Sequence, residues 1–543
     1  MKIFQGQLVD LHTRDIYPAE VRVEHGRIAG IRRLEKAEGF YILPGFVDAH
    51  VHIESSMLVP SEFARLAVVH GTVATVSDPH EIANVLGAAG VHYMIENGRR
   101  VPFKFNFGAP SCVPATAFET AGAAIDAEGV AELLRMPEVK YLAEMMNYPG
   151  VLHQDPEVMA KLAAARRLGK PVDGHAPGLR GEDARRYFQA GISTDHECFT
   201  YEEGLEKLQM GVKVIIREGS AARNFDALIG LLPQFPDQVM FCSDDKHPDG
   251  LILGHINQLA ARAVAAGCNR FDVLRAACLN PVEHYGLDVG QLRPGDPADF
   301  ILVESLESFN VRATYIDGTL VAEDGRSRIE RVEARVINNF NTSPKQPEEF
   351  QLPTEGPQIQ VIRALDGEIV TESFTAVAKV ENGQAVSDPA RDILKIAVVN
   401  RYEDAAPALG FINGFGLKEG AIASCVGHDS HNIIAVGADE ASICRAVNLI
   451  IANKGGIAAV SAAGEHVLPL PVAGILTNAD GYEVAQAYKE MDAFAKQQQG
   501  CTLGAPFMAL SFMALLVIPS LKLGDKGLFD GRAFRFTPLF VGG

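Results

Sequence analysis

Two histidines near the start of the chain have the spacing of a metal-binding pair. The run Pro44–His52, PGFVDAHVH, reads as a turn followed by a β-strand. Residues i and i+2 of a strand project from the same face, so His50 and His52 can reach one cation together. A single His-x-His pair is weak evidence, because two unrelated histidines on a strand give the same pattern. The metal interpretation therefore depends on further ligands elsewhere in the chain.

More side chains of the metal-binding type close later strand-like runs. Glu144 ends the fourth such run, His175 the fifth, His196 the sixth and Asp244 the eighth. With the first pair they make four imidazoles and two carboxylates. Such a set suits one or two divalent first-row metals, and it does not choose among Mn²⁺, Fe²⁺ and Zn²⁺.

The elements that must position these residues alternate along residues 44–285. The β-rich runs are Phe46–Ile53, Val73–Asp78, Phe105–Pro110, Val139–Tyr148, Pro171–His175, Ser193–Phe199, Lys213–Gly219 and Val239–Asp245, with amphipathic helical runs between them. Eight strand–helix units favour an α/β fold of the (β/α)₈ TIM-like barrel type, whose active sites lie at the C-terminal ends of the strands. Periodicity alone leaves seven strands or an open sheet as alternatives.

Two short β-rich segments flank this barrel. Neither residues 1–43 nor residues 286–340 can bury a core alone, so we expect them to join as one small β-sandwich domain into which the barrel is inserted. Residues 341–357 read as a polar, Pro-rich linker, and residues 358–543 as a C-terminal α+β domain. The apolar run Ala505–Leu521 is shorter than the about 20 residues of a membrane span and contains two prolines, so we expect it to be buried core.

The composition is that of a globular protein of several domains. The chain has 543 residues, and 68 acidic against 49 basic side chains give a net charge of −19. This charge argues against nucleic acid or an anionic membrane as the main partner. The 8 cysteines are scattered without a CxxC pair, which is typical of free thiols in a reducing compartment. We therefore expect a cytoplasmic protein that acts on a small molecule.

Several longer motifs narrow the interpretation. Besides PGFVDAHVH they are SDPHE at 77–81, EMMN at 144–147, DGHAP at 173–177, DHE at 195–197, CSDD at 242–245 and APFMALSF at 505–512. Together they resemble the amidohydrolase superfamily and, within it, the bacterial adenine deaminases, over essentially the whole chain. The resemblance implies hydrolytic deamination of adenine to hypoxanthine and ammonia at a binuclear metal centre, as part of purine salvage or catabolism.

The resemblance also implies a role for each ligand-type residue. The first metal would be bound by His50, His52 and Asp244, the second by His175 and His196, and Glu144 would bridge the two. The two ions would be Mn²⁺ or Fe²⁺, with Zn²⁺ also compatible. Metal-bound hydroxide would attack C6 of adenine, and Glu144 or Asp244 would move the protons.

The bridging position has an alternative. Many binuclear members of the superfamily use a carboxylated lysine on the fourth strand, and Lys140 lies on that strand, on the same face as Glu144. Glu144 is nearer the C-terminal end of the strand, where the metals should lie. We therefore predict Glu144 as the bridge and Lys140 as an ordinary residue at the start of the strand.

Four residues at strand ends are candidates for catalysis or substrate binding. His80 would contact the attacked carbon or the leaving group, and Asp78 would orient a ligand or the substrate. The alternative for this pair is a turn that starts a helix. Arg217 and Glu218 are candidates for hydrogen bonds to the purine edge, with an ion pair at the barrel mouth as the alternative.

The C-terminal domain contains one unusual motif, GHDSHN at 427–432. Its histidines, His428 and His431, would cap the active site or bind another metal, and the alternative is a polar turn between strands. The apolar character of this domain favours a homodimer or a larger oligomer.

Two other functions compete with adenine deamination. A cyclic-amide hydrolase of the same superfamily, such as a hydantoinase or dihydroorotase, is disfavoured by Glu144 and by the SDPHE motif. Such an enzyme also needs a cation for its carboxylate product, and Arg217 is the only nearby candidate. A barrel that has lost catalysis is disfavoured because every ligand position is filled.

Overall fold

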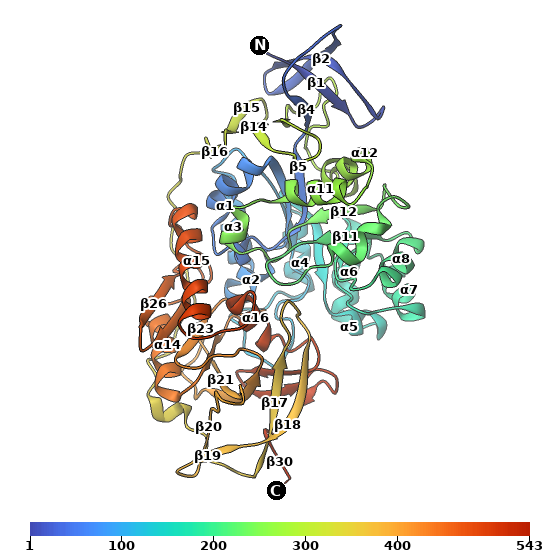
Figure 1. The fold of residues 1–543 in the computed structure, drawn as a ribbon. Coiled ribbons are helices and arrows are strands. Elements are labelled where there is room, and N and C mark those ends of the chain that lie inside the picture. Colours follow the sequence, from blue (N-terminus) through green and yellow to red (C-terminus); the bar gives the residue numbers. More distant parts are fainter. Residues whose placement is uncertain (543) are drawn as a thin grey trace.

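The predicted strand–helix units close into a barrel. The computed structural model describes residues 1–542. Within it the barrel strands form two parallel ladders, β5–β6–β7–β8–β9 and β10–β11–β12. The backbone N–H of Asp244 donates to the carbonyl of His50 at 3.0 Å, and that of Ser193 donates to Val172 at 2.9 Å, so the two ladders meet at both seams. The predicted eight-stranded barrel is thereby confirmed (Figure 1).

The barrel strands are short and buried. They are β5 (Phe46–Val51), β6 (Thr72–Ser77), β7 (Lys104–Ala109), β8 (Val139–Met145), β9 (Val172–Gly174), β10 (Thr194–Asp195), β11 (Lys213–Arg217) and β12 (Val239–Cys242). Their apolar side chains pack on both faces, as in other parallel sheets covered by helices. Several end earlier than predicted, because the polar residues that follow them belong to the loops at the barrel mouth.

Helices surround these strands. They are α1 (Pro60–Ala67), α2 (His80–Leu86), α3 (Ala88–Gly98), α4 (Ala127–Leu134), α5 (Tyr148–Leu152), α6 (Pro156–Arg167), α7 (Gly181–Gln189), α8 (Tyr201–Gln209), α9 (Phe225–Leu228), α10 (Pro248–Leu251), α11 (Ile256–Ala265), α12 (Arg270–Leu274) and α13 (Asn280–Tyr285). Side chains of Asp126, Asp155 and Thr200 accept backbone N–H groups at the starts of α4, α6 and α8. These caps satisfy donors that a helix cannot pair internally.

The segments before and after the barrel share one sheet, with the strand order β16–β15–β14–β13–β4–β1–β2–β3. The strands are β1 (Lys2–Asp10), β2 (Asp15–Glu24), β3 (Arg27–Arg33), β4 (Tyr41–Pro44), β13 (Phe300–Val303), β14 (Val311–Ile316), β15 (Thr319–Glu323) and β16 (Arg326–Ser327). Ile42 of β4 pairs with Leu302 of β13, so backbone hydrogen bonds join the two segments as predicted. In Figure 1 this sheet lies at the end of the molecule opposite the C-terminal domain.

The C-terminal domain is built on a second mixed sheet with the order β18–β17–β22–β21–β24–β23–β25–β26. These strands are β17 (Gln358–Ala364), β18 (Thr371–Val377), β21 (Leu394–Val399), β22 (Ala408–Asn413), β23 (Ala421–Ser424), β24 (Ile433–Gly437), β25 (Gly456–Ser461) and β26 (Gly464–Pro469), and short strands β19 (Lys379–Glu381), β20 (Gln384–Val386), β27 (Leu521–Gly524), β28 (Gly527–Asp530), β29 (Arg535–Phe536) and β30 (Phe540–Val541) complete the domain. The long helices α14 (Glu440–Asn453) and α15 (Gly481–Gln497) pack on this sheet. A mixed sheet with two long helices packed on it makes this an α+β domain, the class predicted for residues 358–543.

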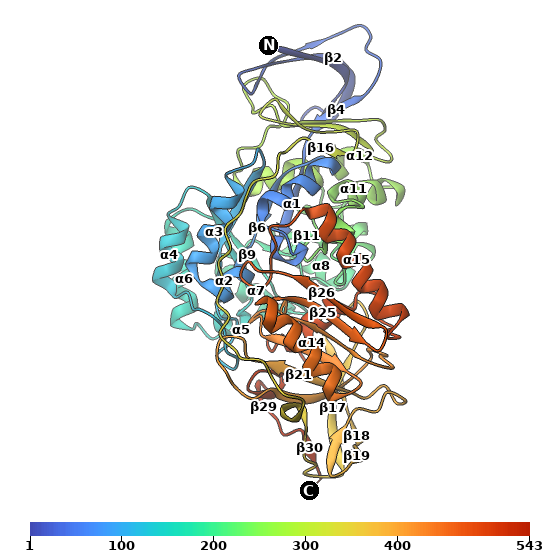
Figure 2. The same ribbon diagram turned by 90° about the vertical axis from the view of Figure 1, so that its left-hand side faces the viewer.

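An extended segment, residues 328–346, connects the two large parts of the protein. It runs along the outside of the barrel, where the hydroxyl of Tyr93 donates to the carbonyl of Arg335 at 2.9 Å (Figure 2). At its far end the fully buried Arg401 donates from Nη2 to Asn338 Oδ1 at 2.7 Å and to the carbonyl of Ala473 at 2.8 Å. These bonds attach the segment to both domains.

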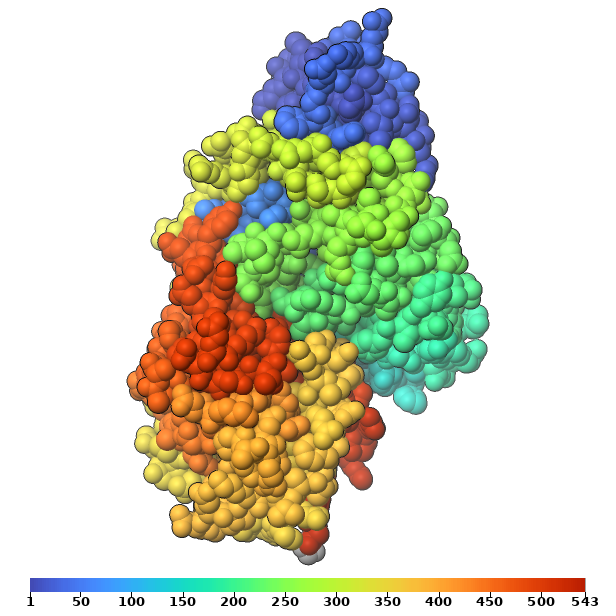
Figure 3. All heavy atoms as spheres, in the orientation of Figure 1, coloured from blue at the N-terminus to red at the C-terminus, as the bar shows by residue number. Residues whose placement is uncertain are grey.

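The C-terminal domain packs directly on the barrel. Thr477 exchanges backbone hydrogen bonds with Met57 (2.8 Å) and Val59 (3.2 Å) of the barrel, and Figure 3 shows the contact between the two parts. The apolar run 505–521 forms α16 (Pro506–Ser511) and a largely buried stretch after it, as predicted. No helix within residues 1–542 combines the length and apolarity needed to cross a membrane.

Candidate active site

The six predicted metal ligands meet at the mouth of the barrel. His50 is on β5 and Glu144 on β8, while the other four directly follow strands or lie one residue beyond them. The pocket above them is lined from the barrel by His52, His80, Glu81, Glu144, Met146, His175, His196, Glu197, Arg217, Asp244 and Asp245. Its opposite wall comes from the C-terminal domain. The structure therefore brings the predicted ligands into one buried site.

Three ligand atoms converge at the end of β5. His50 Nε2 and His52 Nε2 lie 3.2 Å apart, and Asp244 Oδ1 is 3.5 Å from the first and 3.3 Å from the second. His52 Nδ1 donates to the carbonyl of Asp78 at 3.2 Å, which leaves Nε2 with its lone pair facing the site. Metal–ligand bonds of about 2.1 Å place neighbouring ligand atoms roughly 3.0–3.4 Å apart. This arrangement fits a first-row cation.

Glu144 faces two groups of histidines with its two oxygens. Oε1 lies 3.4 Å from His52 Nε2 and 3.4 Å from His80 Nδ1, and Oε2 lies 2.7 Å from His175 Nδ1 and 3.1 Å from His196 Nε2. Burial by itself raises the pKa of Glu144, but the two imidazoles facing Oε2 hold that pKa well below its usual range. An ionised carboxylate between two groups of imidazoles is suited to bridge two cations.

Lys140 lies at the opposite end of β8. It lines a separate hollow beneath the barrel with Phe105 and Glu138, where the strand begins. The alternation of side chains places Lys140 and Glu144 on one face, but the length of the strand separates them. Glu144, and not Lys140, therefore lies among the predicted metal ligands.

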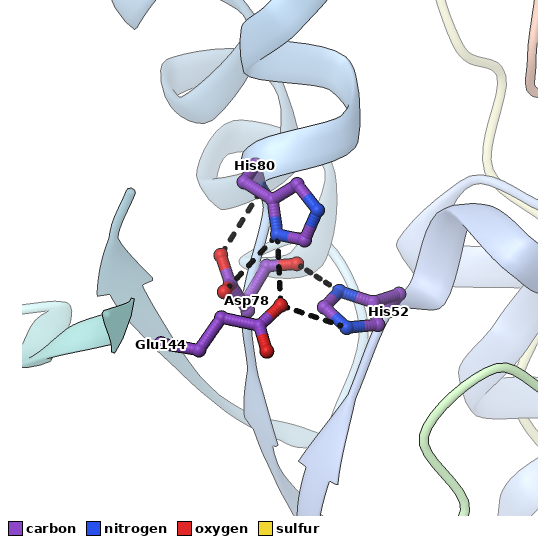
Figure 4. A group of neighbouring side chains, drawn as sticks. All are labelled: His52, Asp78, His80 and Glu144. Atoms are coloured by element: carbon purple, nitrogen blue, oxygen red, sulfur yellow. Dashed lines mark hydrogen bonds and ion pairs between the residues drawn. The ribbon is translucent and has the colours of Figure 1, made fainter. Parts of the chain in front are cut away.

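Asp78 and His80 flank the carboxylate of Glu144. His80 Nδ1 is 3.1 Å from Asp78 Oδ2 and 3.4 Å from Glu144 Oε1. Figure 4 shows the His80 ring facing Glu144 and the Asp78 carboxylate, while the backbone carbonyl of Asp78 faces His52. Burial disfavours a charge on His80, but the carboxylates of Asp78 and Glu81 raise its pKa well above the usual value. His80 is also the first residue of α2. It therefore lies in the helix-starting turn that was the alternative prediction, and its side chain still points into the site.

Arg217 reaches the pocket through a buried ion-pair cluster. Its Nη2 donates to Glu197 Oε2 at 2.9 Å, and its Nη1 donates to Asp244 Oδ2 at 2.7 Å. Burial alone raises the pKa of Asp244, but this guanidinium is the main influence that holds it well below its usual range. Asp244 also has φ of 53°, a left-handed backbone conformation that non-glycine residues adopt uncommonly.

Glu218 points away from the pocket. Strand alternation turns its carboxylate outward, where Arg262 Nη1 pairs with it at 2.5 Å. The expected ion pair therefore forms with a helix residue, and the structure does not bring Glu218 to the predicted substrate site.

Further charged residues hold the ligand loops in place. The buried Lys207 donates from Nζ to Asp195 Oδ2 (2.9 Å), Glu203 Oε1 (2.7 Å) and the carbonyl of Ala176 (2.8 Å), and so links the loops that carry His175 and His196. Asp48 accepts from the backbone of Ser243 at 2.9 Å and pairs with His255 at 2.8 Å. Lys207, Glu203 and His255 lie outside the sequence motifs named above.

The C-terminal domain supplies the wall of the pocket opposite the barrel. From the sequence, only His428 and His431 of this domain were expected near the active site. Ile369, His428, Asp429, Phe512, Leu515, Val517 and Ile518 line the pocket. The GHDSHN motif signalled His428, but the apolar run 505–521 was expected to be core alone. In the structure its residues after α16 line the same pocket as the predicted metal ligands.

Comparison with known proteins agrees with this architecture. Residues 41–321 match the amidohydrolase family model, and residues 368–535 match the model for the adenine deaminase C-terminal domain. An adenine deaminase of Salinibacter ruber is 56% identical over 99% of this chain and 98% of its own length, and one of Sulfurovum sp. is 57% identical over 98% of each. The chain belongs to the adenine deaminase family.

The similarity extends over both large parts of the molecule. An adenine deaminase of Methanosarcina barkeri is 53% identical over 100% of both chains. Among solved structures, a β-aspartyl dipeptidase of Fervidobacterium islandicum covers 61% of this chain and 100% of its own, with 16% identity and a TM-score of 0.47. The match to the adenine deaminase C-terminal domain includes every residue of the pocket wall named above.

Proposed function

We propose that the protein catalyses the hydrolytic deamination of adenine to hypoxanthine and ammonia. The observation that carries the proposal is the 56% identity over 99% of the chain to a relative named adenine deaminase. The site supports it, because all six ligand-type residues lie close together at the barrel mouth. The cyclic-amide hydrolase considered above is not favoured, since relatives at 46–57% identity over nearly the whole chain are named adenine deaminases.

We further propose a binuclear centre, with Mn²⁺ or Fe²⁺ as the ions and Zn²⁺ as a compatible substitute. One ion would be held by His50, His52 and Asp244, the other by His175 and His196, and Glu144 would contact both. When bound, the ions would supply positive charge that lowers the pKa of the attacking water. The remaining chemistry is assigned to the side chains of the chain itself.

The reaction requires two proton transfers. The oxygen of water adds to C6, the C6–N6 bond breaks, and the two protons of water end on ring N1 and on the departing ammonia. Asp244 is kept ionised by Arg217 and is suited to accept a proton from water. His80, whose pKa is raised, is suited to donate one to the amino group as it leaves.

Asp78 and Arg217 act in this scheme by positioning. The Asp78 carbonyl orients His52, and its carboxylate keeps His80 charged. The Nη1 and Nη2 atoms of Arg217 are engaged by Asp244 and Glu197. Adenine could therefore contact only the part of the guanidinium that lines the pocket.

An ultraviolet assay of adenine conversion tests the proposal. Purified protein is stripped with a chelator and reconstituted separately with Mn²⁺, Fe²⁺ and Zn²⁺, and ammonia is measured in parallel. We expect metal-dependent loss of adenine with stoichiometric ammonia. Absence of turnover in protein that holds two ions per chain would contradict the proposed substrate, and hydantoins and dihydroorotate would be tested next.

Two further predictions accompany this function. We propose a homodimer, because the C-terminal domain is apolar, and a cytoplasmic location, because the cysteines are scattered. Light scattering of the metal-loaded protein tests the first, and fractionation of the source cells tests the second.

A further inference from the structure

A loop of the C-terminal domain enters the active-site pocket. It follows β23 and carries His428 and Asp429 into the wall opposite the predicted metal ligands. The side chain of His428 is 5% exposed, although it comes from a different domain than the metal ligands. A titratable side chain buried at this position needs partners on the facing barrel.

One nitrogen of His428 is anchored by the barrel. Its Nδ1 contacts Oε1 of Glu81, the last residue of the SDPHE motif. The other oxygen of Glu81 lies 2.5 Å from His431 Nε2, and the backbone N–H of Gly427 donates to His431 Nδ1 at 3.2 Å. Because Nδ1 accepts this hydrogen bond, neutral His431 carries its proton on Nε2, the nitrogen that faces Glu81. The glutamate then has one oxygen left for His428, whose Nδ1–H donates to it.

The ring of His428 is also fixed in its plane. Phe512 stacks on it, with the ring centroids 5.2 Å apart and the planes inclined by 22°. Nε2 then faces the pocket and has no hydrogen-bond partner among residues 1–542, the nearest carboxylate oxygen being Asp245 Oδ1 at 3.8 Å. Buried polar atoms are rarely left without a partner, so this atom indicates a ligand.

The chemistry of this nitrogen indicates which ligand atom it meets. Burial lowers the pKa of His428, but the carboxylates of Glu81 and Asp245 raise it to about 9, so Nε2 carries a proton at neutral pH. Phe512, Leu515 and Ile518 form an apolar wall beside it that suits a flat heteroaromatic ring. The unprotonated ring nitrogens of adenine are in-plane acceptors for such a donor.

We propose that His428 is a substrate-binding residue that donates a hydrogen bond from Nε2 to a ring nitrogen of adenine. Glu81 and His431 are its positioning residues. The inference rests on the proposed function and deepens it, because it makes the C-terminal domain part of adenine recognition rather than a cover alone.

Variants of His428 separate the hydrogen bond from packing. His428→Phe keeps a ring that can stack on Phe512 but has no donor, and His428→Gln keeps an amide N–H at a similar reach. We expect His428→Phe to bind competitive purine inhibitors about tenfold to a hundredfold more weakly, with unchanged metal content, and His428→Gln to recover part of the loss. His466→Phe, an exposed position on β26, is the matched control and should match the wild type.

Deaza analogues identify the contacted atom. Inhibition constants of 1-, 3- and 7-deazaadenine are measured against the metal-loaded wild type and His428→Phe. We expect one analogue, the one that lacks the contacted nitrogen, to bind both proteins equally, while the other two lose affinity in the variant. Equal losses for all three analogues, or no loss for any, would overturn the proposal.

The same experiment distinguishes this inference from the proposed function. If His428→Phe does not fold, the inhibition constants are compared between the wild type and His428→Gln. A displaced donor still changes the relative affinities of the three analogues. If the wild type binds and deaminates adenine and His428→Phe binds the analogues with unchanged affinity, only the inference about His428 is refuted. A metal-loaded wild type that neither binds nor deaminates adenine sinks the proposed function itself.

Discussion

Replacing Glu144 by glutamine removes the one charge that faces both halves of the centre. The amide has nearly the same shape, so the barrel core is expected to be retained. The affinity of a four-ligand transition-metal site, about 10–16 kcal/mol, corresponds to about 2.5–4 kcal/mol for each ligand. Loss of one ligand therefore weakens binding roughly a hundredfold to a thousandfold. Because the two oxygens of Glu144 face different histidine groups, both ions should be affected.

Metal content and turnover measured together test this expectation. Wild type, Glu144→Gln, His175→Ala and Lys140→Gln are dialysed against one metal buffer, analysed for bound metal and assayed with adenine. Glu144→Gln should lose most of both ions and nearly all activity, His175→Ala mainly one ion, and Lys140→Gln neither. If Glu144→Gln kept its metal and full activity while Lys140→Gln lost both, the bridge would have to be Lys140.

Three further changes test the buried charges around the site. Arg217→Met leaves the carboxylates of Glu197 and Asp244 without a cation and should cost about 3–5 kcal/mol, seen as a lower Tm and a large loss of kcat, whereas an unchanged kcat would contradict the role of the ion pair. Lys207→Met should destabilise the protein by a similar about 3–5 kcal/mol and lower its metal content, because the ligand loops lose their common tie; normal metal content would argue against that tie. Burial lowers the pKa of Lys522 to about 7, below the about 10.4 of an unfolded lysine, so the unfolded chain binds more protons in between and stability falls as the pH drops from about 10 to 7. Lys522→Met should remove this dependence, so the Tm of the variant minus the Tm of the wild type should increase as the pH drops from about 10 to 7. A Tm difference that does not change with pH would show that Lys522 does not titrate in this range.

Local patterns were enough to predict the barrel and to place the candidate metal ligands at one end of it. The strands of a parallel barrel are short apolar runs that end at the active face, so polar residues such as His175 and Asp244 mark the ends of strands directly. The same reasoning predicted Glu144 rather than Lys140 as the bridging residue, because Glu144 is nearer the C-terminal end of its strand and so nearer the active face of the barrel. Glu218 illustrates its limit, since adjacent residues of a strand face opposite sides and only one of the pair with Arg217 can face the pocket.

Contacts between distant segments could not be predicted in this way. Glu81 meets His428 across 347 positions of sequence, and Arg217 meets Glu197 and Asp244 from three different strand ends. The buried run after α16 has the same composition whether it fills a core or lines a pocket.

By itself the sequence determined which residues can bind metal, which elements carry them and to which family the chain is similar, because these properties depend on residue type and local spacing. The tertiary structure alone decided that Glu144 faces two histidine groups, that Arg217 keeps Asp244 charged and that His428 completes the pocket from another domain. The physical reason is that electrostatic and hydrogen-bond energies depend on distances of a few ångströms, which are set by the packing of elements far apart in the chain.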